Sequence, residues 1–140
     1  MADYICFQKN RIEPECMELK VTAQNSVISA SAKIYITAAM LEELQEQIHS
    51  FLQEPDLEGY WENDVPGIGG PPCVTLRLLP EEDPRLVLIE IYMELNDGGS
   101  FMEHNCRFYV AATREQLSRF SQGIQEFCAS EVGAQLTLGA

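Results

Sequence analysis

Residues 27–53 read VISASAKIYITAAMLEELQEQIHSFLQ and contain a clear change from strand-like to helix-like spacing. Up to Ile36 every second residue is apolar, and this period of two predicts a half-buried strand over 27–36. At Thr37 the period changes, and apolar residues then recur at helical spacing: Leu41, Leu44, Ile48 and Phe51. Threonine is a good N-cap because its hydroxyl accepts a hydrogen bond from the first helical turn. We therefore predict a helix from Thr37 to about Gln53.

The same pattern occurs again 76 residues later. Thr113 and Gln116 have the spacing of a capping box. The apolar residues that follow have the spacing of the first helix: Leu117, Phe120, Ile124 and Phe127. Two strand–threonine–helix units with identical internal spacing suggest an internal duplication. The alternative is two ordinary amphipathic helices that match by chance.

Alternating apolar residues predict four further strands, at 16–23, 73–79, 85–95 and 104–112. Turn residues at 24–26, 80–84 and 97–100 join neighbouring strands, and such short links are typical of antiparallel pairing. A short preceding strand is possible at 4–7, and 132–140 is expected to form a tail or a short added strand. The intervening 54–72 shows no period.

These elements fit one domain, since 140 residues is an ordinary domain length. Each predicted helix must bury its apolar stripe, and each strand has one apolar face. The simplest arrangement is an α+β fold with the element order β-β-α-β-β-β-α. We expect residues 1–140 to form a single antiparallel sheet of five or six strands with both helices on one face.

The charge of the chain is high and unevenly distributed. It carries 22 Asp and Glu against 9 Lys and Arg, a net charge of −13. Such acidity disfavours direct binding to nucleic acid or to anionic membranes. No Lys or Arg occurs between Ile34 and Leu76, where eight acids occur: Glu42, Glu43, Glu46, Glu54, Asp56, Glu58, Glu62 and Asp64. Concentrated like charge suggests a basic partner that neutralises it; the alternative is a solvated helix face followed by a solubilising loop.

Two aromatic residues, Tyr60 and Trp61, lie inside the acidic connection at 54–72. Aromatic side chains surrounded by charge are typical of interface hot spots. The alternative is that one or both fold inward and fix the loop over the sheet. The predicted partner-binding residues are the acids and the two aromatics: Glu42, Glu43, Glu46, Glu54, Asp56, Glu58, Tyr60, Trp61, Glu62 and Asp64.

The compartment is expected to be the cytoplasm. The N-terminus lacks the basic start and apolar stretch of a secretory signal. No apolar run approaches the roughly 20 residues of a membrane helix. The five cysteines include no Cys-x-x-Cys pair, which argues against a disulfide framework or a structural zinc site.

The sequence shows no catalytic constellation. His49 is expected on the outward face of the first helix, and Cys106 continues an apolar strand face two residues after His104. That spacing places the two backbones roughly 7 Å apart, which is long for a nucleophile and its base. Glu90 and Glu94 share one side of a strand and are explained by a solvated sheet face. We predict a protein that is not an enzyme and needs neither cofactor nor metal.

The order of elements resembles the WapI-type family of small bacterial immunity proteins, over residues 16–128. The resemblance lies in a strand leading into a helix, a Gly-aromatic loop, a long strand, and a strand leading into a capped helix. The residues concerned are 32–36, Leu41, Leu44, Phe51, Gly59, Tyr60, Trp61, 86–95, 108–110, Leu117 and Phe127.

This resemblance implies a protein that binds and neutralises one toxin, and a basic cognate toxin would suit the acidic surface. Two alternatives stay open. One is an acidic secretion chaperone that binds an effector segment. The other is a small enzyme or ligand-binding domain with a cleft under the 54–72 loop.

Overall fold

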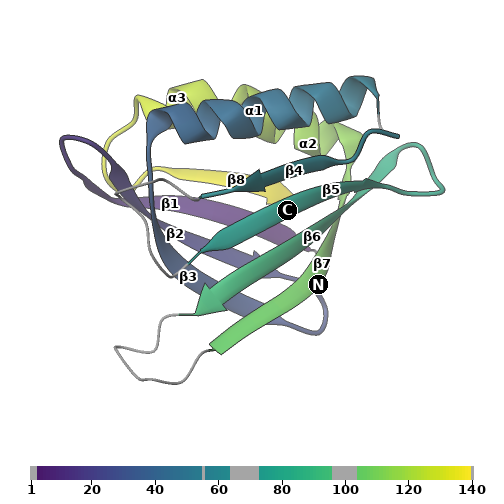
Figure 1. Cartoon of the computed structure of the whole chain (residues 1–140), viewed down its shortest axis with the longest axis horizontal. Coiled ribbons are helices and arrows are strands. Elements are labelled where there is room, and N and C mark those ends of the chain that lie inside the picture. Colours follow the sequence, from purple (N-terminus) through teal and green to yellow (C-terminus); the bar gives the residue numbers. More distant parts are fainter. Residues whose placement is uncertain (1–2, 55, 64–72, 96–103, 140) are drawn as a thin grey trace.

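The computed structural model describes residues 3–54, 56–63, 73–95 and 104–139 (Figure 1). Within these ranges the chain forms eight strands and three helices in the order β1 (Tyr4–Ile12), β2 (Met17–Gln24), β3 (Ser29–Ile36), α1 (Ala38–Gln53), β4 (Gly59–Glu62), β5 (Val74–Pro80), β6 (Leu86–Leu95), β7 (His104–Thr113), α2 (Arg114–Gln122), α3 (Ile124–Cys128) and β8 (Gln135–Gly139). The expected turn at 97–100 lies outside the described residues.

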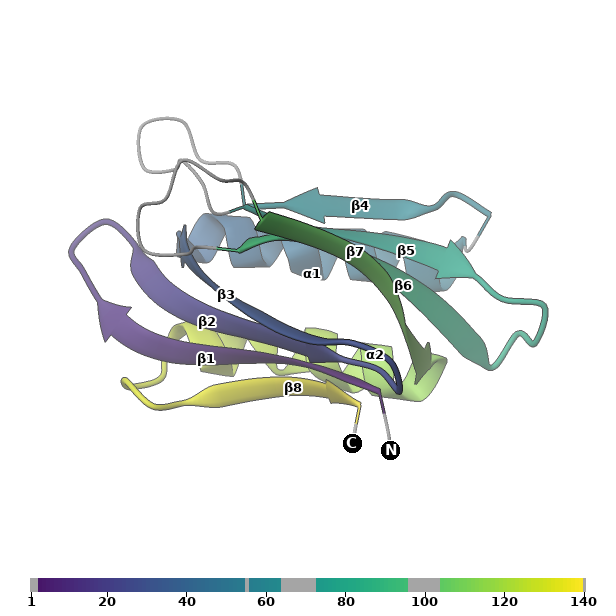
Figure 2. The same ribbon diagram turned by 90° about the horizontal axis from the view of Figure 1, so that it is seen from below.

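The strands form two four-stranded antiparallel sheets. Sheet A has the strand order β3-β2-β1-β8, and sheet B has the order β4-β5-β6-β7. The two sheets face each other, and the helices close the side between edge strands β4 and β8 (Figures 1 and 2). The α+β class is confirmed, but the predicted single sheet with both helices on one face is wrong.

Three strands account for the error. The sequence suggested β1 only as far as residue 7, and β4 lies inside the aperiodic connection. β8 is the short added strand that was one of two expectations for 132–140, but its pairing was not predicted. β1 pairs with both β2 and β8, so the N-terminal strands and the last strand complete a sheet without β5, β6 or β7. The apolar faces of the two sheets then bury each other, and the helices cover only the remaining open side.

The element order βββαβ occurs twice along the chain. The first half runs from β1 to β4 and the second from β5 to β8, with α2 and α3 in the place of α1. The last strand of each half pairs with the first strand of the other half, β4 with β5 and β8 with β1. β4 and β8 also begin 76 residues apart, at Gly59 and Gln135. This reciprocal exchange supports the internal duplication that the helix spacing suggested.

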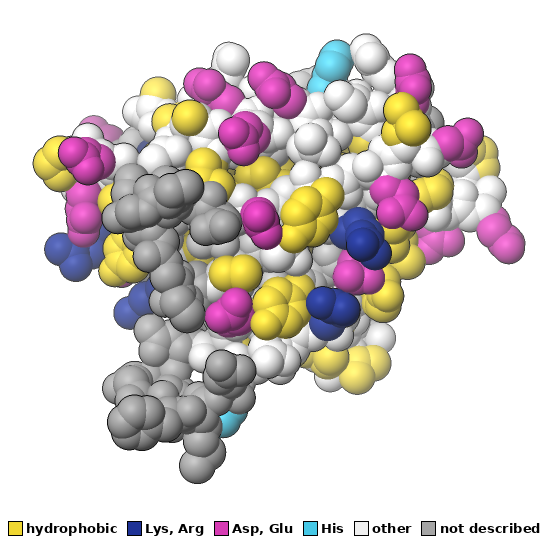
Figure 3. Space-filling model, in the orientation of Figure 1, with side chains coloured by type: hydrophobic (Ala, Val, Ile, Leu, Met, Phe, Trp, Pro, Cys, Tyr) yellow, Lys and Arg dark blue, Asp and Glu magenta, His cyan; other side chains and the backbone are white. Residues whose placement is uncertain are grey.

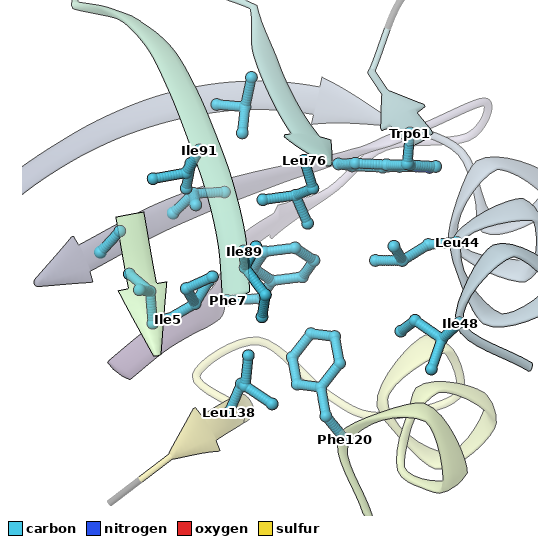
Figure 4. Close-up of a cluster of buried hydrophobic side chains, with 14 of the residues drawn as sticks. Ile5, Phe7, Leu44, Ile48, Trp61, Leu76, Ile89, Ile91, Phe120 and Leu138 are labelled. Atoms are coloured by element: carbon cyan, nitrogen blue, oxygen red, sulfur yellow. The ribbon is translucent and has the colours of Figure 1, made fainter. Parts of the chain in front are cut away.

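Aromatic side chains from three layers meet in the core (Figure 4). Phe7 on β1 lies between Trp61 on β4 and Phe120 on α2, with ring centroids 6.3 and 5.5 Å away. The Phe7 and Phe120 rings meet edge to face, an arrangement favoured by the charge distribution of aromatic rings. These contacts connect sheet A, sheet B and the helix layer in one core.

A lysine side chain is buried among these apolar residues. Lys9 on β1 is 1 % exposed, and its ammonium donates hydrogen bonds to the carbonyls of Phe127 (2.7 Å), Cys128 (3.2 Å) and Ser130 (2.9 Å). Burial lowers the pKa of Lys9. The three bonds satisfy carbonyl groups at and just beyond the end of α3, where the chain turns towards β8.

Over the described ranges, no helix combines the length and the apolar character that spanning a membrane requires.

Candidate functional site

The solvent side of α1 is acidic. Glu42, Glu43 and Glu46 are exposed there, while the apolar stripe of the helix is buried against the core. Thr37 caps the helix as predicted, since its hydroxyl accepts a hydrogen bond from the backbone N–H of Met40 (3.3 Å). Acidic side chains lie along this side of the molecule in the space-filling view (Figure 3). We call Glu42, Glu43 and Glu46 the α1 acidic face.

A groove of about 440 Å³ lies between α1 and β4. Carboxylates from both elements line it, together with two polar and two largely apolar side chains: Glu43, Glu46, Glu62, Gln47, Tyr60, Met40 and Trp61. The α1 acidic face therefore continues into a hollow. We call this hollow the acidic groove.

Two hydrogen bonds hold β4 against α1 and fix the width of the acidic groove. The indole Nε1–H of Trp61 donates to the carbonyl of Met40 (2.8 Å), and the backbone N–H of Tyr60 donates to Oε1 of Gln47 (3.1 Å). On the other side of the strand, a Cβ on Gly59 would lie 2.8 Å from Cδ1 of Leu78. Glycine at this position lets β4 lie close to β5.

The electrostatics of the groove favour a cation. The Tyr60 hydroxyl donates to Oε2 of Glu62 (3.0 Å). Partial burial, with the hydrogen bond and charge of Glu62, raises the pKa of Tyr60, so the phenol stays neutral where it meets the carboxylate. In the described part of the chain, no basic side chain lies within ion-pair distance of Glu43, Glu46 or Glu62.

The corresponding place in the second half of the chain is filled. There the helix is interrupted at Gly123, between α2 and α3, and the Leu136 side chain from β8 packs against this glycine. A Cβ on Gly123 would lie 2.8 Å from Cδ1 of Leu136. The same helix–strand arrangement is thus closed by apolar packing in one half and open and acidic in the other.

The structure brings together only part of the predicted site. Glu42, Glu43, Glu46, Tyr60 and Glu62 lie on α1 or β4 and are exposed. The remaining acids with a described position are exposed in the connection beyond the C-terminus of α1: Glu54, Asp56 and Glu58. Asp64 lies outside the described residues.

Trp61 is buried, so its prediction as a surface contact is wrong and the inward alternative holds. It is 3 % exposed, because its position in β4 turns the indole towards Phe7 and the core. Sequence reasoning missed Gln47, which lines the groove and binds the β4 backbone. No local signal identifies Gln47, since its role depends on the pairing of β4 beside α1.

The catalytic candidates do not form a reactive group. Cys106 is partly buried, and burial raises the pKa of its thiol, which lowers the thiolate fraction that a nucleophile needs. His49 lines a second groove, of about 600 Å³, between α1 and the helices α2 and α3, where the other lining side chains are mainly Gln and Ser. Within the described ranges, no group of three or more His, Cys, Asp and Glu residues is arranged to hold a metal ion.

Comparison of the chain with protein-family models, with curated proteins and with solved structures gives no match.

Proposed function

We propose that this chain is a non-enzymatic binding protein that holds a basic surface of another protein against α1 and β4. One observation carries the proposal: carboxylates from a helix and from a strand converge on an open groove, with no basic partner in the described part of the chain. Unpaired like charges repel one another and reduce stability, whereas a cationic partner converts that repulsion into attraction.

The groove suits the side chains of Lys and Arg. Their aliphatic stems can pack on the exposed ring of Tyr60, while the cationic group meets Glu43, Glu46 or Glu62. Hydrogen bonds from a guanidinium to a carboxylate are charge-assisted and can form in pairs. The exposed α1 acidic face would act earlier, because a field of one sign speeds the encounter with a partner of opposite charge.

The resemblance to WapI-type immunity proteins suggests which kind of partner the chain binds. We propose that the partner is a basic bacterial toxin and that the chain neutralises it in the cytoplasm by covering its cationic surface. If the toxin acts on nucleic acid, bound carboxylates would occupy the place of substrate phosphates.

The proposal is tested by NMR titration of the labelled chain with the product of the neighbouring gene. We expect the largest amide shifts in α1 and β4, at Glu43, Glu46 and Tyr60. Residues on the side of sheet A turned away from the core, such as Thr22 and Ser31, serve as the internal control and should not shift. Absence of binding contradicts the immunity function. Binding that shifts sheet A and leaves α1 unchanged contradicts the proposed site.

A further inference from the structure

We propose that two copies of this chain associate through the outer face of sheet B, the side turned away from sheet A. Alternate residues of β4, β5, β6 and β7 point to this side, and no described helix covers it. We define the sheet B face by six of these residues: Tyr60, Arg77, Glu90, Tyr92, Arg107 and Tyr109. The inference does not rest on the proposed function, although Tyr60 and Glu62 at the β4 edge of this face also line the acidic groove.

Four side chains of the sheet B face, Glu90, Tyr92, Arg107 and Tyr109, contact one another. Strand register sets Glu90 between Arg77 and Tyr109. The Tyr109 hydroxyl donates to Oε2 of Glu90 (3.1 Å), and Nε of Arg107 lies 3.6 Å from Oε1 of the same carboxylate. The Arg107 guanidinium also lies 5.4 Å from the centre of the Tyr92 ring. Side chains that are already ordered lose less entropy on association than free ones.

Sheet A shows that this chemistry is not required by the fold. Its outer face contains a cross-strand row of Gln8, Lys20 and Lys33 and a neighbouring row of Cys6, Thr22 and Ser31. Lysine and serine are depleted at protein interfaces, whereas tyrosine and arginine are enriched in their hot spots. At one end of the sheet A face Arg11 and Tyr35 flank Glu18, so the two outer faces differ in their central rows, which are Gln8, Lys20 and Lys33 on sheet A and Arg77, Glu90 and Tyr109 on sheet B.

Side chains already bind backbone groups at both edges of sheet B. Gln47 accepts from the Tyr60 N–H on β4. On β7, Asn25 donates to the carbonyl of Tyr109 (2.8 Å), and Asp3 accepts from the N–H of Ala111 (2.8 Å). An additional strand would have to displace these bonds at either edge. The face, rather than an edge, is therefore the surface of sheet B that is open to association.

The charges of this surface select a second copy over a basic partner. Arg77 and Arg107 stand there with Glu62, Glu90 and Glu94, so both signs are interspersed in a chain of net charge −13 (Figure 3). The arginines would repel the basic partner that the α1 acidic face attracts. In a two-fold dimer the same surface meets itself, and each arginine can lie opposite a glutamate of the other copy.

Analytical ultracentrifugation of the purified chain from about 5 to about 500 µM tests the inference, since mass action drives a self-associating chain to the dimer over this range. We expect a monomer–dimer equilibrium that persists or tightens at about 0.5 M NaCl, because salt screens the repulsion between two acidic chains. Arg107→Glu should raise the dimer dissociation constant about tenfold or more. Tyr109→Ala should also weaken the dimer.

Matched controls lie on sheet A. Lys20→Glu makes the same change of charge on the other outer face, and Tyr35→Ala removes another edge-strand tyrosine whose hydroxyl binds a glutamate (Tyr35 to Glu18, 3.2 Å). Neither control should change the dimer. Arg77→Glu provides a second test if Arg107→Glu unfolds in a thermal melt. A chain that stays monomeric throughout, or controls that weaken the dimer as much as the sheet B variants, overturn the inference.

Discussion

The indole Nε1–H of Trp61 donates a buried hydrogen bond of 2.8 Å to the backbone carbonyl of Met40, which joins edge strand β4 to the first turn of α1. The same indole lies 6.3 Å from the ring of Phe7. Trp61 therefore fixes the position of β4, and with it the acidic groove, from the core side. Its own side chain presents almost no surface to a partner.

Replacing Trp61 should destabilise the fold. Trp61→Phe keeps an aromatic ring but removes the buried N–H, and should lower the free energy of unfolding by about 1–2 kcal/mol. Trp61→Ala also leaves a cavity and should cost about 3–5 kcal/mol. Urea unfolding measures both. Tyr60→Phe, on the neighbouring exposed residue, is the control and should change stability by no more than about 0.5 kcal/mol. Equal effects of the two phenylalanine variants would contradict the structural role of Trp61.

The second prediction concerns Gly59, where β4 lies close to β5. In Gly59→Ala the new methyl group would lie 2.8 Å from Cδ1 of the buried Leu78, so the variant should be destabilised by about 1–3 kcal/mol. Leu78→Val removes a methylene group near the clash. If the steric explanation holds, the double variant is more stable than the sum of the two single effects. Strict additivity in this double-mutant cycle would argue against it.

The third prediction concerns the buried ammonium group of Lys9. Lys9→Met keeps much of the side-chain length but removes the donor to three carbonyls, and should cost at least about 1–3 kcal/mol because buried acceptors lose their partner. Lys20→Met, on the exposed face of β2, should change stability by no more than about 0.5 kcal/mol. Thermal unfolding of both variants at the same pH gives the comparison. A Lys9→Met variant as stable as the control would show that the bonds do not stabilise the fold.

Alkaline pH should weaken the fold through three tyrosines. Hydrogen bonds to Glu18 and Glu90 raise the pKa of Tyr35 and Tyr109, and partial burial with the bond to Glu62 raises that of Tyr60. A raised folded-state pKa contributes stability below the unfolded value of 10.0, and this contribution is lost as pH rises through the folded pKa.

Urea unfolding between about pH 8 and 11 measures this loss. In the triple variant Tyr35→Phe, Tyr60→Phe and Tyr109→Phe, the free energy of unfolding should fall less than in the wild type between about pH 8 and about pH 11. Parallel curves for the two proteins would contradict the prediction. The exposed pair Arg85 and Asp83 gives a matched control, because Asp83→Asn should leave the alkaline slope unchanged.

Local patterns predicted the helices well. The cap at Thr37 and the capping box of Thr113 and Gln116 form as the sequence indicated, because each depends on residues within one helical turn. The break at Gly123 was not predicted. Glycine is a poor helix former, and Leu136 from β8 also occupies the space beside it.

The number of sheets could not be predicted from the same patterns. Alternation of apolar residues identifies a strand but not its neighbour, and β1 pairs with β8 from the opposite end of the chain. Lys9 also interrupts the apolar alternation of Ile5 and Phe7, although it points inward, because its charge is matched by carbonyls from α3 and the turn after it.

The candidate site also has a part that the sequence predicts and a part that depends on the three-dimensional structure. The acidity of α1 followed from composition and helical spacing, whereas the groove depends on Tyr60 and Glu62 lying beside Glu43. That neighbourhood arises only when β4 joins sheet B next to α1. A sequence can therefore indicate the charge of this surface but not its shape.

If α1 attracts a basic partner, the association rate constant with the product of the neighbouring gene should depend on the α1 acidic face. Stopped flow at increasing ionic strength measures this rate constant. Glu42→Gln, Glu43→Gln and Glu46→Gln combined should slow association about tenfold at low salt and flatten its salt dependence. The control combines Glu81→Gln, Glu82→Gln and Glu131→Gln, which change the net charge equally at exposed positions outside α1 and β4. The control should have a much smaller effect on the association rate constant. Equal slowing by the two triple variants would contradict this prediction, because net charge rather than the α1 acidic face would then govern the encounter.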